Sequence, residues 1–433
     1  MSERILYASI DGNAVGVLRE AAGIWAFEYA TTWVVNPRAF ALAPSLPLRA
    51  GEHVDGSTLR PVQWYFDNLL PEEAQRDLLA AEAKLPAADS FGLLAWYGAE
   101  SAGSLTLLPA PEIPASVGGF RPLPDTELSA RIGALPRTSL AYGAAKRMSL
   151  AGAQHKLPVV LREDQLLEPL GAAASTHLLK PDHPSPDYPH SAVNEWFVMS
   201  LAKAAGLAVP VVARRYVPQP VYLVERFDRA NGTRLHAVDA CQLLGLDRSF
   251  KYAEGSIATL ARIAMACRSS AVARTSLFEW VVFNLLTGNS DAHLKNLSFL
   301  VSAEGIQLAP FYDLLAVGVY ESPVFGQQGW PGTTPLAWPL PLARRFGELS
   351  RAAVVDAGCA LGLSRTTATR VLEQLCRQLP TLTANLVART AAENMTLVAA
   401  RPALAPTLGG EMRCLRALQH AVVLEMVRRL GGG

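Results

Sequence analysis

Two acidic residues and one amide in the second half of the sequence have the types and spacing of a phosphoryl-transfer site. Residues 288–296 read Gly-Asn-Ser-Asp-Ala-His-Leu-Lys-Asn and follow the apolar run 280–286. Asp291 and Asn296 have the D-x-x-x-x-N spacing of a protein-kinase catalytic loop, in which the Asp orients the attacking hydroxyl and the Asn holds magnesium. Asp313 follows a predicted strand downstream, where a kinase has its second magnesium ligand.

The chemistry explains why these residue types belong together. The phosphates of ATP carry negative charge that Mg²⁺ neutralises, and this hard cation prefers oxygen ligands such as a carboxylate and an amide carbonyl. Lys295, next to Asn296, adds a cation that can stabilise the transferred phosphoryl group. Asp291 or Asn296 taken alone would be interpreted as a helix or turn cap. Together with Asp313 and the flanking apolar segments, they favour phosphoryl transfer.

ATP binding also requires a lysine for the phosphates and a loop that covers them. Lys180 ends the predicted strand 176–180, which would deliver its ammonium group to a cleft. The alternative is a strand-end lysine that lies along the surface. Glu195, in the next predicted helix, is either a partner for Lys180 or a solvated helix carboxylate. The segment 149–156 is small and contains a glycine, so its backbone N–H groups can bind phosphate, although it matches neither of the two common glycine-rich patterns.

A hinge is predicted where the strand 221–224 runs into Glu225, Arg226 and Phe227. This is the place where a kinase sequence joins its two lobes. Backbone groups around Glu225 and Phe227 would bind the adenine edge, with the Phe227 ring against its face. The other interpretation is an ordinary strand that enters a turn.

The elements that must position these residues change character along the chain. Apolar and polar residues alternate around the turn 11–13, which is typical of a β-hairpin, and a helical pattern begins after Pro71. Five prolines and two adjacent glycines lie between Pro109 and Pro124 and indicate a boundary. Short strands follow, with one helix at 192–205 that Gly206 would cap. Helical periodicity dominates beyond Arg234, interrupted by a strand-like segment at 297–301. The predicted fold class is α+β, a two-lobed kinase-like fold with a mostly helical C-lobe. The predicted divisions are an N-terminal α+β domain at 1–112, a linker at 113–137, an N-lobe at 138–228 and a C-lobe at 229–433.

Composition argues against several classes of protein, namely general nucleic-acid binders, zinc or redox proteins and membrane proteins. The 433 residues carry a net charge of +1, which argues against nucleic-acid binding over the whole surface. The five cysteines are scattered without a C-x-x-C pair, so no zinc or redox motif is indicated. Since no uncharged apolar run of membrane-spanning length and no signal-peptide pattern is visible, we expect a cytoplasmic protein without membrane contact.

These segments, in this order, resemble the HipA family of serine/threonine kinase toxins from bacterial toxin–antitoxin systems. The resemblance extends from residue 1 to about residue 345. It rests on 64–71 (WYFDNLLP), 148–156 (MSLAGAQHK), 176–180 (THLLK), 194–210, 224–229 (VERFDR), 283–298 (FNLLTGNSDAHLKNLS) and 308–313 (LAPFYD).

The resemblance implies a role for each residue. Asp291 would be the catalytic acceptor with Lys295 beside it, and Asn296 and Asp313 would hold Mg²⁺. Ser149 matches the serine that HipA kinases autophosphorylate, which would switch the enzyme off because a dianion at a phosphate site repels ATP. The expected ATP-binding residues are Ala151, Gly152, Ala153, Gln154, His155, Lys156, Lys180, Glu225, Arg226, Phe227, His293 and Tyr312.

The resemblance also implies partners. The usual partner is a helix-turn-helix antitoxin that binds operator DNA, so contact with DNA would be indirect. The typical substrate belongs to the translation machinery, above all an aminoacyl-tRNA synthetase phosphorylated on a serine. Two departures concern the loops and the choice of partner rather than the chemistry: His155 stands where an acid is common, and 338–340 replaces a glycine-containing stretch.

Two alternatives remain open from the sequence. One is a pseudokinase-like module that binds an antitoxin and co-represses DNA without transferring phosphate, against which the retention of all four polar site residues counts. The other is a metal-dependent phosphohydrolase that uses Asp291, His293 and Asp313. That enzyme would need further His or Asp ligands, and none stands at metal-ligand spacing nearby.

Overall fold

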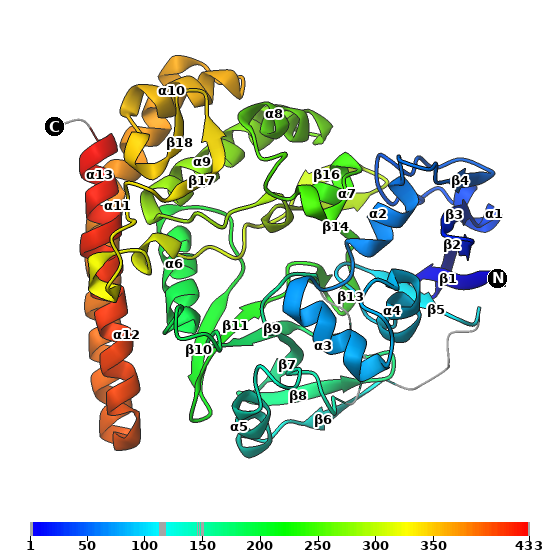
Figure 1. Cartoon of the computed structure of the whole chain (residues 1–433), viewed down its shortest axis with the longest axis horizontal. Helices are drawn as coiled ribbons and strands as arrows, with labels where there is room; N and C mark the ends of the chain where they lie inside the picture. The colour runs from blue at the N-terminus through cyan, green and yellow to red at the C-terminus, as the bar shows by residue number, and fades with distance from the viewer. Residues whose placement is uncertain (1–2, 112–117, 145, 147, 149–150, 432–433) are drawn as a thin grey trace. The chain divides into compact units, whose positions relative to one another are not determined.

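The computed structural model describes residues 3–111, 118–144, 146, 148 and 151–431 (Figure 1). The contacts between residues divide the chain into two compact units. The first unit comprises Met1–Lys180, Val224–Lys251 and Leu297–Ala309, and the second comprises Pro181–Leu223, Tyr252–Asn296 and Pro310–Gly433. The division of the chain at residues 112, 137 and 228 stays a prediction.

The first unit begins with a five-stranded antiparallel sheet in the order β4-β3-β2-β1-β5. The predicted hairpin is its start, because Asp11 and Gly12 between β1 and β2 both have positive φ angles, of 45° and 81°. Alternate β1 residues such as Leu6 and Ala8 are buried, which fixes the face that packs into the core. The strands are β1 (Arg4–Ile10), β2 (Asn13–Ala21), β3 (Ile24–Tyr29), β4 (Glu52–Val54) and β5 (Leu105–Leu108).

Short helices accompany this sheet, and the helix predicted after Pro71 is present. A buried polar cluster joins three of the chain segments: Arg76 donates to Asp67 Oδ1 at 2.8 Å and Ser90 donates to the same oxygen at 2.6 Å. Arg248 reaches Asp67 Oδ2 at 2.8 Å, so the carboxylate is fully used. The helices are α1 (Thr31–Val34), α2 (Pro61–Asp67), α3 (Glu73–Ala83) and α4 (Ser90–Tyr97).

A second set of strands in the first unit has the order β9-β7-β8-β6. The outermost strand β6 lies inside the predicted linker 113–137, and α5 follows it there. That segment is therefore structured over these two elements, because β6 pairs antiparallel with β8 although its sequence is rich in Gly and Pro. The elements are β6 (Gly119–Pro122), α5 (Asp125–Gly133), β7 (Leu157–Arg162), β8 (Gln165–Leu170) and β9 (His177–Pro181).

The remaining segments of the first unit form small antiparallel pairs. The strand predicted at 297–301 is β15, which lies between β14 and β16. A capping box between Asp239 and Gln242 begins α7. The elements are β12 (Arg229–Ala230), β13 (Thr233–Arg234), β14 (Ala237–Asp239), α7 (Ala240–Leu244), the 3₁₀ turn η1 (Arg248–Phe250), β15 (Ser298–Ser302) and β16 (Gly305–Leu308).

The second unit is mostly helical, as predicted for the C-terminal half. The helix α6 ends at Gly206 with φ +96°, the predicted C-cap, and the long helix α11 contacts α12 and α13 along the red end of the chain in Figure 1. Its helices are α6 (Ser191–Ala205), α8 (Ile257–Ala266), α9 (Ser270–Thr287), α10 (Arg351–Ala360), α11 (Arg365–Ala400), α12 (Ala405–Ala417) and α13 (Leu424–Leu430).

Strands and single turns complete the second unit. They are β10 (Val212–Tyr216), β11 (Pro220–Glu225), β17 (Pro335–Leu340), β18 (Ala343–Arg345), η2 (Leu294–Asn296), η3 (Val317–Val319), η4 (Pro323–Phe325), η5 (Phe346–Glu348), η6 (Pro402–Leu404) and the π-helical turn η7 (Leu418–Val423). The α+β fold class is confirmed. Within the part of the chain that the structure describes, no helix is both long enough and apolar enough to cross a lipid bilayer.

Candidate active site

The predicted catalytic loop begins where the buried helix α9 ends. Gly288 at its C-cap has φ +67°, in the left-handed region. A Cβ at this position would lie 2.7 Å from Val422 Cγ1 and 2.8 Å from the Trp330 ring. Glycine is therefore required for both the backbone angle and the space, and this tight exit fixes the starting point of the loop.

Side-chain amides hold the backbone of the loop on both sides of Asp291. Asn289 Oδ1 accepts from the Asp291 N–H at 3.1 Å, and Asn289 Nδ2 donates to Asn284 Oδ1 at 2.8 Å. Asn296 Nδ2 donates to the Asp291 carbonyl oxygen at 2.9 Å. The single turn η2 brings Asn296 back to Asp291, which is the physical reason for the five-residue spacing.

The Asp291 carboxylate has a hydrogen-bond donor of its own. Tyr252 Oη donates to Asp291 Oδ1 in a short hydrogen bond. The Tyr252 ring meets the His293 ring edge to face, with centroids 5.0 Å apart and an interplanar angle of 82°. The carboxylate is thus aimed by a side chain from outside the loop, while the half-buried Asp291 remains accessible from one side.

Lys295 and Asn296 are buried, with 6% and 5% of their surface exposed. Tyr312 Oη donates to the Lys295 carbonyl oxygen at 2.7 Å, so the loop is tied to the segment that carries Asp313. Asp313 has φ +57°, a left-handed backbone angle that is uncommon for a residue with a side chain and is concentrated at functional sites.

Glu195 shares its surroundings with Asp313. Burial, followed by the charges of Glu195 and Asp313, raises the pKa of the Tyr222 hydroxyl well above its usual value. Glu195 is only 4% exposed, so the interpretation of it as a solvated helix carboxylate is wrong. The helix α6 turns this residue inward because its face with Trp196 and Phe197 is buried along most of its length.

The chemistry of these side chains fits Mg²⁺. The amide nitrogen of Asn296 is used by the Asp291 carbonyl, so its Oδ1 is the atom that it presents to a ligand. Together with the carboxylate of Asp313 it supplies the oxygen donors that this cation prefers. Among the described residues, no group of three or more His, Cys, Asp or Glu side chains is placed to hold a metal ion.

The predicted phosphate loop lies in the first unit and is attached to α3. The Glu72 N–H donates to the Gly152 carbonyl at 3.3 Å, next to a parallel bridge between Pro71 and Gly152. The amide nitrogen of Gln75 lies 2.8 Å from His155 Nδ1, and His155 is buried. The start of α3 thus holds the loop in place. Ser149 lies outside the described residues.

Lys156 closes this loop on itself. Its Nζ donates to the Ala151 carbonyl at 2.5 Å, and a Cβ at Gly152 would lie 2.5 Å from the same Nζ. Gly152 has φ +107°, so the backbone angle favours glycine here, and a side chain would also displace the Lys156 ammonium group. Ala153 is exposed and Gln154 half-buried.

Lys180 and the predicted hinge are also in the first unit. Lys180 lies in β9, one residue before the strand ends at Pro181 rather than at its predicted last position, and is 8% exposed. The Arg226 N–H donates to the Thr176 carbonyl at 2.9 Å. The Arg226 side chain turns inward, pairs with Asp228 at 2.7 Å and donates to Ser175 Oγ at 2.9 Å. Only the backbone of Arg226 is therefore suited to the predicted contact with adenine.

The structure thus places the predicted residues in two groups, and their roles stay predictions. The first unit holds Ala151, Gly152, Ala153, Gln154, His155, Lys156, Lys180, Glu225, Arg226 and Phe227. The second unit holds Asp291, His293, Lys295, Asn296, Tyr312 and Asp313. The supporting residues Tyr252, Gln75 and Asn289 were not predicted. Of these three, only Asn289 could have been found from the sequence, because it stands within the predicted catalytic loop.

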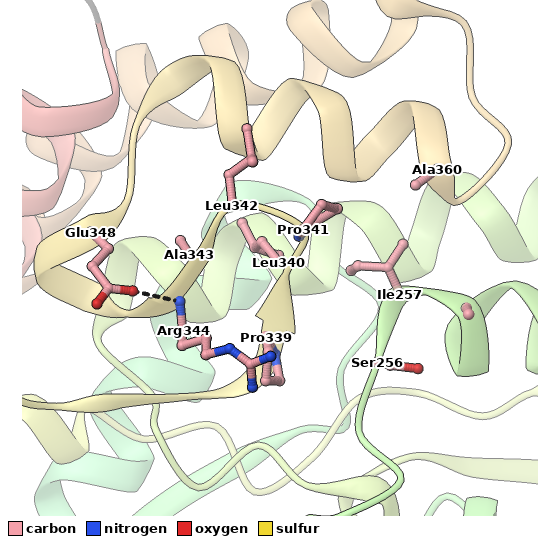
Figure 2. Close-up of a pocket in the computed structure, with 11 residues that line it drawn as sticks. Ser256, Ile257, Pro339, Leu340, Pro341, Leu342, Ala343, Arg344, Glu348 and Ala360 are labelled. Carbon is pink, nitrogen blue, oxygen red and sulfur yellow. Dashed lines mark hydrogen bonds between the residues drawn. The ribbon is translucent and has the colours of Figure 1, made fainter.

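A cavity of about 640 Å³ lies elsewhere in the second unit (Figure 2). Its walls are mostly apolar, and the backbone N–H of Arg344 donates to a Glu348 carboxylate oxygen at 2.7 Å. The predicted site residues are absent from the eleven that line it, which are Ser256, Ile257, Ala258, Pro339, Leu340, Pro341, Leu342, Ala343, Arg344, Glu348 and Ala360.

Comparisons with known proteins found matches over both the N-terminal and the C-terminal part of the chain. Residues 6–108 match the model of the HipA N-terminal domain, and residues 148–383 match that of the HipA-like C-terminal domain. The chain is 39% identical over 340 residues to a Sinorhizobium fredii protein whose name is "Putative kinase Y4mE". That match covers 74% of this chain and 79% of the other. It is 32% identical over 330 residues to the serine/threonine-protein kinase toxin HipA of Shewanella oneidensis, covering 71% and 73%.

A solved structure is similar over almost the whole chain. It is from the complex of HipA, HipB and operator DNA of Shewanella oneidensis MR-1. The TM-score is 0.77 at 27% identity, and the match covers 98% of this chain and 99% of that one. The chain belongs to the HipA family and is a serine/threonine protein kinase with an α+β, kinase-like fold.

Proposed function

We propose that this kinase transfers the terminal phosphoryl group of ATP to a serine or threonine hydroxyl of a protein and needs Mg²⁺ to do so. The observation that carries the proposal is the held catalytic loop, in which Asn296 binds the backbone of Asp291 and Tyr252 binds its carboxylate. Such fixed polar groups lower a barrier because they need no reorganisation during the reaction.

Each residue of the loop has a step in this reaction. Asp291 orients the substrate hydroxyl and accepts its proton, and Tyr252 orients its carboxylate. Lys295 stabilises the charge on the transferred group. Asn296 Oδ1 and Asp313 are the ligands for Mg²⁺, which supplies charge neutralisation at the β- and γ-phosphates when it is bound.

The first-unit residues bind the nucleotide in this proposal. Lys180 contacts the phosphates, the loop 151–156 covers them, and the backbone of 225–227 binds adenine. We further propose that Ser149 is an autophosphorylation site. Two negative charges added next to a phosphate-binding loop would repel ATP and inactivate the enzyme.

The biological role is proposed from the relatives. The similar Shewanella structure contains HipA, HipB and operator DNA. We infer that this chain is likewise the toxin of a toxin–antitoxin pair in the cytoplasm, that a helix-turn-helix antitoxin binds it, and that it reaches DNA through that partner. The proposed substrate is an aminoacyl-tRNA synthetase or another translation factor.

The decisive experiment compares the wild type with Asp291→Asn. Purified protein is incubated with Mg²⁺ and γ-labelled ATP, and phosphopeptides are mapped. We expect label on Ser149 in the wild type and a loss of at least about a hundredfold in Asp291→Asn, because the general base is removed. The matched control is Asp77→Asn, at an exposed position of α3, which should label like the wild type.

Three other results would contradict the proposal. Equal labelling of Asp291→Asn would exclude the assigned base. Release of free phosphate without labelled protein would indicate a phosphohydrolase. A wild type that binds an antitoxin but labels neither itself nor translation factors would indicate a non-catalytic module.

A further inference from the structure

A second and larger cavity, of about 1210 Å³, lies entirely within the first unit. The turn between β1 and β2, the helix α4, the strands β6 and β7, the loop 171–176 and the β12–β13 hairpin line it. Two aromatic rings in its wall, Trp96 and Phe120, are 39% and 38% exposed. Because the volume suits a small molecule and partly exposed rings offer flat apolar contact, the cavity has the form of a ligand site.

The back of the cavity is a buried charge cluster centred on Glu100, which is 1% exposed. Lys146 donates to Glu100 at 2.6 Å, and Arg229 and Arg234 reach it at 3.2 Å and 3.3 Å. Burial opposes ionisation of this carboxyl, but the charges of Arg226, Lys146 and Arg234 together lower the pKa of Glu100 to about 2. One carboxylate is thus shared by several cations.

Among the described residues, Asp228 is the second acid that forms ion pairs in this cluster. It pairs with Arg226 at 2.7 Å and with Arg229 at 3.1 Å. Four cations therefore share two carboxylates, which leaves an excess of two positive charges on the back wall. Arg162 and the exposed acids Asp11 and Glu225 complete the charged lining.

Arg229 has one hydrogen-bond donor that the acids of the cluster do not satisfy. Its side chain is 8% exposed, and its Nε is buried without a hydrogen-bond partner among the described residues. Burial, and then the like charge of Arg226, lower the pKa of Arg229 to about 10. Its Nη1 donates to the carbonyl oxygens of Gly103 and Asp228 at 2.9 Å, so Nε is the atom that lacks an acceptor. Among the described residues, Arg234 makes long hydrogen bonds, of 3.3 Å to Glu100 and 3.4 Å to the Ala172 carbonyl. Both side chains line the cavity and retain hydrogen-bonding capacity for a ligand.

We propose that this cavity binds a small phosphorylated ring compound of the nucleoside monophosphate type. The phosphate accepts hydrogen bonds from Arg229 and Arg234, and the ring packs against Trp96 and Phe120. With Arg162, Asp11 and Glu225 included, the charged groups of the cavity keep a net positive charge. A phosphate offers more oxygen acceptors to the two guanidinium groups than a peptide carboxylate does. The cavity shares Glu225 and Arg226 with the proposed hinge. The residues assigned to this ligand, Arg229, Arg234, Trp96 and Phe120, are not among the proposed ATP-binding residues, and the proposal does not depend on the kinase reaction.

Isothermal titration with UMP and AMP tests this proposal, with a saturating Mg-bound non-hydrolysable ATP analogue present throughout. We expect binding to persist in the presence of the analogue. Arg234→Gln should weaken it about tenfold or more, because a charge-assisted hydrogen bond is lost. Arg234→Lys should retain part of the affinity. Arg137→Gln, at an exposed position of the same unit, should bind like the wild type.

Circular dichroism melts show whether each variant is folded, and Arg234 is preferred to the more buried Arg229 for this reason. Absence of binding by both nucleotides would overturn the proposal. So would displacement by the ATP analogue, affinity that is unchanged in Arg234→Gln, or binding of a peptide C-terminus in place of UMP and AMP. A chain that binds UMP but labels no protein would refute the proposed kinase reaction alone.

Discussion

At the scale of single residues, the catalytic loop depends on hydrogen bonds that lie at the ends of buried elements. Gly288 ends α9, Asn289 and Asn296 bind the backbone around Asp291, and Tyr252 binds its carboxylate. The carboxylate that we assign as the base is therefore held from two sides. A change at a residue that supports this loop, such as Tyr252, should affect the rate of the reaction more than the binding of ATP.

Tyr252→Phe tests this at the residue scale. We expect kcat to fall about tenfold with little change in the KM for ATP, since a hydrogen bond to a charged group is worth roughly 1.5 kcal/mol. Steady-state kinetics on a protein substrate measure both constants. Tyr142→Phe, at an exposed tyrosine, is the matched control. An unchanged kcat in folded Tyr252→Phe would show that the observed hydrogen bond does not orient the base.

At the scale of elements, the proposed phosphate loop is attached to the start of helix α3 by hydrogen bonds. The loop joins the helix start through the backbone of Glu72 and Gly152 and through Gln75 and His155. His155 takes the place of the acid that the resemblance led us to expect. In this chain a hydrogen bond between the side chains of His155 and Gln75 attaches the loop to the N-terminal domain.

Gln75→Ala should loosen that loop. We expect the KM for ATP to rise about fivefold, because a buried hydrogen bond contributes about 1 kcal/mol, while the catalytic loop in the second unit is untouched. ATP-dependent kinetics and a thermal melt check the effect. Gln165→Ala, at an exposed residue of β8, should leave the KM unchanged. Equal KM values for the two variants would mean that α3 does not position the loop.

At the scale of the whole molecule, the first unit is held together by the buried cluster around Glu100. This residue lies in the N-terminal segment. Its partners lie more than 120 residues later, Arg226 within the predicted hinge and Arg229 and Arg234 just after it. The Gly103 N–H also donates to Asp228 Oδ2 at 2.7 Å. The N-terminal domain and the hinge strand thus share one polar core.

Removal of the Glu100 charge should destabilise this unit. Glu100→Gln leaves buried cations without a counter-ion, and we expect a loss of about 3 kcal/mol in the free energy of unfolding at pH 7. Urea titration measures it, with the exposed Glu163→Gln as the control. A loss no larger than that of the control would show that the cluster does not hold the unit together.

The same carboxyl predicts acid sensitivity. Its pKa is lowered from 4.5 to about 2 in the folded chain, so its contribution is present above pH 4.5 and is lost as the pH falls towards 2. The wild type should therefore lose more stability than Glu100→Gln over that interval. Parallel pH dependences of the two proteins would contradict this.

The sequence alone determined features that depend on neighbouring residues. The hairpin at Asp11, the helix α6 with its glycine cap and the strand β15 follow from periodicity and turn residues, which act over a few positions. The spacing of Asp291 and Asn296 predicted a catalytic loop for the same reason, because one short turn joins them. The family was recognised because several such local segments occur in a fixed order.

Only the tertiary structure decided which distant side chains meet. Tyr252 lies 39 residues from Asp291, Gln75 lies 80 residues from His155, and Glu100 lies 129 residues from Arg229. Burial also decided that Glu195 is not a solvated carboxylate, and strand pairing ordered β6 within the predicted linker. These contacts arise from packing between elements, and the local pattern of residues does not encode the partner across such distances.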